Sequence, residues 1–128
     1  MVSQKSSSLC RILATSAVLA LGLMSQQALA HAHLKTETPA ADTTLKSAPT
    51  ELTLGFSEGI EPNFSKVALS GPDNKAIETG KLALAANDKT QAIVPLNAPL
   101  TAGKYTVSWH VVSVDGHKTE GQYSFTVQ

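Results

Sequence analysis

Two groups of side chains in this sequence could bind a metal ion. His31 and His33 stand two residues apart near the start, and Asp115 and His117 stand two residues apart near the end. After residue 30 the chain has no Cys and no Met, so only nitrogen and oxygen donors are available. Such donors in a tetragonal arrangement suit Cu(II), whereas Cu(I) prefers sulfur, and zinc accepts the same ligands. Taken singly, the first group also fits an ordinary chain terminus and the second a plain turn.

The first 30 residues have the features of a secretory signal peptide. Two basic residues precede an uncharged apolar run of 13 residues at 12–24, and small residues stand at Ala28 and Ala30. A charged start, a short apolar middle and an Ala-x-Ala end are what a signal peptidase recognises. The run is shorter than the roughly 20 residues that span a bilayer. We expect residues 1–30 to be a signal peptide cleaved after Ala30, which leaves a mature domain at 31–128 with no membrane span.

Cleavage would make His31 the first residue. An N-terminal His offers a free amine and the imidazole Nδ1, two nitrogens that can close a chelate ring on one metal ion. The amine has a reference pKa of about 7.7–8.0, so a metal can displace its proton at neutral pH. With Asp115 and His117, this terminus would supply one amine, two imidazoles and one carboxylate. Because the nitrogens must lose their protons, binding is expected to weaken as the pH falls.

Two other histidines are weaker candidates. In a strand that starts at His31, His33 would point to the same face, so it could be a further ligand or a neighbour of the ligands. His110 lies in an alternating segment, on the face opposite Trp109, which predicts a solvent-facing residue. We therefore leave the role of His33 open and place His110 outside the site.

The composition narrows the class of protein. Residues 31–128 carry 8 Lys and Arg against 10 Asp and Glu, without the strongly basic face of a nucleic-acid binder. A 98-residue domain without cysteine must be stable through its core alone or with help from a metal. The residues suggest no nucleophilic catalysis and no phosphate-binding loop. We expect a monomer that is not an enzyme.

Short segments of alternating apolar and polar residues lie between turn-forming residues. They are clearest at 52–57, 67–69, 82–84, 105–111 and 123–127. About seven short strands, each with one apolar face, predict an all-β domain folded as a Greek-key β-sandwich or barrel. Residues 81–87 are the one place where a helical turn could intrude.

The last two strands constrain the loop between them. A two-residue turn at 115–116 would put the apolar rows of the two strands on opposite faces of the sheet. A three-residue loop at 115–117 brings both rows to one face and sets Trp109 opposite Tyr123. We therefore expect an odd-numbered loop there, with both candidate ligands outside the strand ladder.

Much of the mature sequence resembles the CopC family of periplasmic copper-binding proteins, in particular its YobA-type members. The matching segments are HAHLKTETPA at the start, LTLGFSEGIEPNFSKVALSGP, and LTAGKYTVSWHVVSVDGHKTEGQYSFTV near the end. The opening His with a distant Asp-x-His is the most specific feature. The resemblance implies an immunoglobulin-like fold that binds one Cu(II) ion. Its ligands would be the amine and imidazole of His31, the carboxylate of Asp115 and the imidazole of His117.

The resemblance also implies a role. The domain would sequester or carry copper in the periplasm, in copper resistance and homeostasis, and could hand it to a CopD-type inner-membrane protein. Some relatives hold Cu(I) at a second site in a Met-rich loop. Here the corresponding residues 69–88 contain no Met, so we expect that site to be absent.

Two alternatives come from other classes of protein. Copper held by an N-terminal His and a second His also resembles the brace of copper monooxygenases, although those enzymes are usually larger, disulfide-bearing and equipped with a broad substrate face. The other alternative is a metal-free sandwich that acts as an interaction module. Such a module would keep its function with Ala in place of both His31 and His117.

Overall fold

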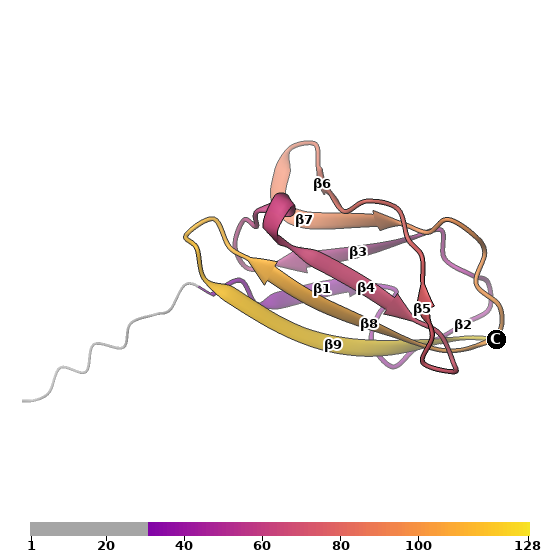
Figure 1. Cartoon of the computed structure of the whole chain (residues 1–128). Helices are drawn as coiled ribbons and strands as arrows, with labels where there is room; N and C mark the ends of the chain where they lie inside the picture. Colours follow the sequence, from indigo (N-terminus) through magenta and orange to yellow (C-terminus); the bar gives the residue numbers. More distant parts are fainter. Residues whose placement is uncertain (1–30) are drawn as a thin grey trace, which may run out of the picture.

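Residues 31–128 form two layers of β-strands in the computed structural model (Figure 1), which describes this part of the chain. The predicted signal peptide and its cleavage site lie outside the described residues. The strands are β1 (Leu34–Thr38), β2 (Thr44–Leu45), β3 (Glu51–Phe56), β4 (Lys66–Ser70), β5 (Ala76–Ile77), β6 (Ala83–Ala85), β7 (Asp88–Pro95), β8 (Gly103–Val112) and β9 (Lys118–Val127). One 3-10 helix, η1 (Pro62–Phe64), precedes β4.

The prediction of an all-β domain is confirmed, with two differences in detail. There are nine strands within residues 31–128 where about seven were expected, because β2 and β5 are pairings of only two residues each. The segment 81–87, where a helical turn seemed feasible, contains β6 instead. No helix of the described residues is long and apolar enough to cross a membrane.

The order of the strands is that of an immunoglobulin-like sandwich. One sheet runs β1-β3-β7-β6 and the other runs β2-β9-β8-β4-β5. The strand pairs are antiparallel, except that β2 and β9 are parallel. The first sheet corresponds to strands A, B, E and D of an immunoglobulin domain, and β4, β8 and β9 correspond to C, F and G. The predicted Greek-key, immunoglobulin-like fold is therefore confirmed.

The core lies between the two sheets and is filled by the apolar faces of their strands. Leu52 and Leu54 of β3 and Val107 of β8 have no exposed surface. Tyr105 is buried near the start of β8, and its hydroxyl donates a hydrogen bond to the carbonyl of Thr101 at 2.7 Å. This is the tyrosine corner of immunoglobulin-like domains, which ties the loop before strand F to the core. Strand β8 is thus anchored at the end that lies away from the β8–β9 loop.

The pairing of β8 with β9 differs from the predicted register by two residues. Trp109 lies opposite Gly121, whereas it was expected opposite Tyr123. Both registers keep the apolar rows on one face, so the alternating pattern cannot distinguish them. The indole of Trp109 distinguishes the two registers, because a Cβ at residue 121 would come within 2.6 Å of the Trp109 Cζ2. Only glycine leaves room for the ring, and the observed register places one there.

The loop at the tip of this hairpin is odd-numbered, as predicted, but it begins one residue earlier. The Ser113 N–H donates to the carbonyl of His117 at 2.9 Å, which leaves the three residues 114–116 as the loop. Gly116 has a φ of +90°, in the left-handed region that glycine adopts without a steric penalty. The predicted boundaries 115–117 were therefore wrong. Asp115 lies on the loop and His117 at its base, both outside the strands as expected.

Candidate metal centre

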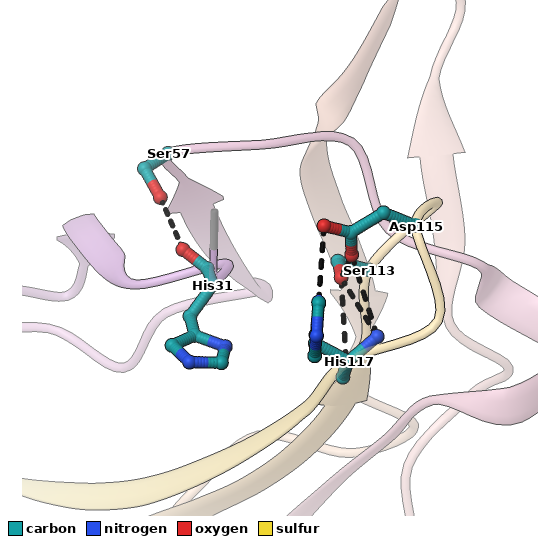
Figure 2. A network of polar contacts seen from close by, with 5 residues as sticks. All are labelled: His31, Ser57, Ser113, Asp115 and His117. Carbon is teal, nitrogen blue, oxygen red and sulfur yellow. Dashed lines mark hydrogen bonds and ion pairs between the residues drawn. The ribbon is translucent and has the colours of Figure 1, made fainter. Parts of the chain in front are cut away.

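The first residues of the described chain and the β8–β9 loop lie at the same end of the sandwich (Figure 1). There the imidazoles of His31 and His117 are neighbours, with ring centroids 4.9 Å apart and planes at 87°. Figure 2 shows the His31 ring turned toward His117. The fold therefore brings together two side chains that the sequence places at opposite ends of the mature domain.

The imidazole of His31 has an unusual environment. Its Nδ1 is buried and has no hydrogen-bond partner among residues 31–128. A buried polar atom left without a partner costs about 1–3 kcal/mol, and folded proteins rarely tolerate it without a reason. Nδ1 is also the nitrogen that would form a chelate ring with a free N-terminal amine. The unsatisfied atom therefore fits a role for His31 in binding a metal ion.

The burial of Ala32 and three hydrogen bonds fix the backbone that carries this ring. Ala32 is completely buried in the core. The Ser57 hydroxyl donates to the carbonyl of His31 at 3.0 Å and accepts from the N–H of His33 at 2.9 Å. The Thr119 hydroxyl donates to the carbonyl of Ala32 at 2.8 Å. Together they hold the start of the chain against the ends of β3 and β9.

Asp115 is held by its neighbours in the loop. Its Oδ2 lies 3.0 Å from Nδ1 of His117, and its Oδ1 accepts a hydrogen bond from the Ser113 hydroxyl. Ser113 is completely buried, and its hydroxyl oxygen also accepts from the backbone N–H of His117 at 3.2 Å. The hydrogen bond from Ser113, followed by that from His117, lowers the pKa of Asp115 to about 2. The loop therefore presents a carboxylate that is ionised at neutral pH.

The three predicted side chains form a line of contacts and do not converge on one point. His31 lies beside His117, and His117 is bonded to Asp115. Accordingly, no three His, Cys, Asp or Glu side chains of residues 31–128 are grouped closely enough to hold an ion. The remaining predicted donor is the amine of His31, which exists only once residue 30 has been removed. The three side chains thus lie at one end of the sandwich without surrounding a common point.

The other two histidines occupy different positions. His33 is exposed, and its ring centroid is 6.1 Å from that of His31. His110 lies on the outer face of β8, where its Nε2 is 3.0 Å from a carboxylate oxygen of Glu120 on β9. The solvent-facing position predicted for His110 is confirmed. His33 lies close to His31, and whether its ring is a ligand is taken up below.

Sequence reasoning overlooked Ser57, although a signal was present. Residues 55–59, GFSEG, match the letter pattern G-x-S-x-G of serine hydrolases. In those enzymes the serine stands on a sharp turn between a strand and a helix and is activated by a histidine. Here β3 does not turn directly into a helix, since the short 3-10 helix η1 begins only at Pro62, and the Ser57 hydroxyl bonds to the backbone at His31 and His33. The pattern thus marks a residue that holds the backbone at His31 and His33, without the arrangement of a nucleophile.

Comparison with known proteins identifies the family. Residues 34–128 match the profile of the CopC domain. The chain belongs to the CopC family. It is 47% identical over 112 residues to the protein YobA of Escherichia coli K12, covering 88% of this chain and 90% of YobA. The resemblance inferred from the sequence segments is therefore confirmed.

Solved structures of the family agree with the fold described above. The crystal structure of CopC from Methylosinus trichosporium OB3b matches with a TM-score of 0.72 and 28% identity, covering 77% of this chain and 94% of that one. PcoC of Escherichia coli, described as a methionine-rich copper resistance protein, matches with a TM-score of 0.69 and 36% identity, covering 77% and 100%. In contrast to that description, residues 31–128 of this CopC domain contain no methionine.

A more distant relative contains such a domain within a longer chain. The copper transport protein CutJ of Bacillus subtilis is 26% identical over 110 residues, which are 86% of this chain but only 20% of CutJ. A region similar to this CopC domain is therefore one part of a much larger protein there.

Proposed function

We propose that this CopC domain binds one Cu(II) ion per chain in the periplasm, and sequesters or carries it in copper resistance and homeostasis. The observation that carries the proposal is the pair of adjacent imidazoles at one end of the sandwich, one of which has a buried Nδ1 without a partner. The names of the family's members support copper as the metal. The absence of sulfur donors in residues 31–128 favours Cu(II) over Cu(I).

The proposed ligands are the amine and Nδ1 of His31, the imidazole of His117 and the carboxylate of Asp115. Because Nδ1 of His117 contacts Asp115, its Nε2 is the nitrogen left for copper. A carboxylate that orients a metal-binding histidine in this way is common in metalloproteins. A carboxylate has about four acceptor sites, so the contacts of Asp115 with Ser113 and His117 leave lone pairs for the ion as well.

Capture of the ion requires no chemical reaction. The Asp115 carboxylate is ionised at neutral pH, and hydrogen bonds lower its pKa to about 2, so the loop offers a negative charge to an approaching cation in acidic solution as well. Strands β8 and β9 hold one side of the site, and the N-terminal residues close it from the other. The relatives are named for copper resistance, which supports binding over catalysis.

Transfer to a membrane protein is a further part of the proposal. In CutJ, a region similar to this domain belongs to a longer copper transport protein. When a copper-binding domain and a transport protein are joined in one chain, each is present at a high effective concentration for the other. We propose that here the two parts are separate proteins. This exported domain would deliver its ion to a CopD-type partner in the inner membrane.

A competition titration with Cu(II) tests the proposal on a chain that begins at His31. We expect one ion per chain, an electron paramagnetic resonance (EPR) spectrum of a tetragonal nitrogen and oxygen site, and weaker binding of zinc. A chain that binds no Cu(II) would contradict the proposal and favour the metal-free interaction module. Copper-dependent turnover of peroxide or oxygen would favour the redox enzyme.

Replacing Asp115 with Asn is expected to weaken Cu(II) binding by at least about 10- to 100-fold, the usual loss when a histidine ligand loses its carboxylate partner, because the change also removes a proposed ligand. The amide keeps the size of the side chain and removes its charge. The same titration measures the loss, with Asp73→Asn as the control, because Asp73 is an exposed carboxylate paired with Lys75. Equal losses in the two variants would show that Asp115 acts only through the net charge of the protein.

A further inference from the structure

The mature N-terminus has a second way of binding Cu(II) that would bypass the loop. A free amine followed by His at the third position can wrap an ion in one plane. The four donors are then the amine, the amide nitrogens of residues two and three, which release their protons to water, and the third residue's imidazole. Four nitrogens in a square plane suit Cu(II) and Ni(II). In the sequence His-Ala-His at 31–33, this chelate would use His33 and leave His117 without a role.

The structure opposes this wrapping at the peptide group between Ala32 and His33. Its N–H donates to the Ser57 hydroxyl oxygen at 2.9 Å, and its carbonyl accepts from the Thr119 hydroxyl at 2.8 Å. Both ends of one peptide group are thus bound, by Thr119 in β9 and by Ser57 directly after β3, and these two strands belong to opposite sheets of the sandwich. To reach copper, the His33 nitrogen would have to leave Ser57.

The neighbouring groups reinforce this hold. The Ser57 hydroxyl donates to the carbonyl of His31 at 3.0 Å, and the Ser57 N–H donates to the carbonyl of His33 at 2.8 Å. The methyl group of Ala32 is completely buried in the core. Wrapping the three residues around an ion would therefore break several hydrogen bonds and pull an apolar side chain into water.

We infer that Ser57 and Thr119 are positioning residues that decide which of the two copper sites forms. We call their two hydroxyl groups the backbone clamp. The clamp keeps the His33 nitrogen away from the metal and leaves the ring of His31 beside that of His117. This inference rests on the proposed function, in that the mature chain must begin at His31. It also explains why the exposed ring of His33, although close to the centre, is not a ligand.

The test compares chains that begin at His31 with and without the clamp. Ser57→Ala combined with Thr119→Val removes both hydroxyls, and Ser57→Thr combined with Thr119→Ser keeps them. Each of these double variants is made in three forms: without a further change, with His33→Ala, and with His117→Ala. Visible absorption and EPR spectra are recorded with one equivalent of Cu(II).

With the clamp present, we expect the spectrum to change with His117→Ala and to stay the same with His33→Ala. Without the clamp, the spectrum should change with His33→Ala and stay the same with His117→Ala. Its visible band should lie at shorter wavelength because of the additional nitrogen ligands. A clamp-free chain that still depends on His117 would overturn the inference. Failure of the proposed function looks different: if the intact chain binds no Cu(II), the clamp-free chain should still bind it through His33.

Amide hydrogen exchange tests the clamp without any copper. Ser57→Ala should speed exchange at the His33 amide by about fivefold, the equilibrium effect of losing one ordinary hydrogen bond. Ser57→Thr should leave the rate unchanged because it keeps the hydroxyl. An exchange rate that is the same in Ser57→Ala as in the unaltered chain would show that Ser57 does not hold this peptide group, and would overturn the inference.

Discussion

A chain that keeps Ala30 in front of His31 is expected to bind Cu(II) at least about 100-fold more weakly than one that begins at His31, since it loses a ligand and not merely a ligand's partner. The extra residue turns the amine into an amide, whose nitrogen can bind the ion only after losing its proton, so the chelate ring of the free amine and Nδ1 of His31 is lost. The EPR spectrum should change at the same time, because one nitrogen leaves the ion. A competition titration of the two purified chains measures the difference.

The control for this experiment adds one Ala after Gln128, at the other end of the chain. It lengthens the protein equally and leaves the amine free, so its affinity should match that of the unextended chain. If retention of Ala30 did not weaken binding, the amine would not be a ligand, and the site would have to be built from side chains such as His33 and His117. The result therefore decides whether removal of the signal peptide creates the site.

The second large effect is expected for His117→Ala, which should also weaken Cu(II) binding at least about 100-fold by removing an imidazole ligand. His117 stands at the base of the loop and lies beside the ring of His31. His110→Ala is the matched control, because His110 is also exposed but lies on the outer face of β8, paired with Glu120. Its affinity should be unchanged.

Comparison of the two histidine variants separates a specific site from general attraction of copper to imidazole. Similar losses for His117→Ala and His110→Ala would indicate that copper is distributed over the histidines of the surface. A loss confined to His117→Ala would support the proposed centre. The unfolding temperature of the copper-free proteins should be nearly the same in both variants, since each residue is exposed.

The fold class was predictable from the sequence because the signal is local. Alternation of apolar and polar residues along each strand reports which face is buried, and this pattern extends over a few neighbouring residues only. It correctly excluded an even-numbered hairpin loop between β8 and β9. It could not distinguish two registers of the same parity, and the predicted pairing of Trp109 with Tyr123 was wrong. The space that Gly121 leaves for the indole appears only when the strands are packed together.

The sequence by itself determined the types of donor in the candidate centre, since the absence of Cys and Met after residue 30 and the positions of His31, Asp115 and His117 can be read directly. Only the tertiary structure decided how these groups are held. Ser57 and Thr119 contact the N-terminal residues across 24 and 87 positions of sequence. Contacts over such separations leave no periodic trace in the sequence, because they depend on how two sheets pack and where their strands end.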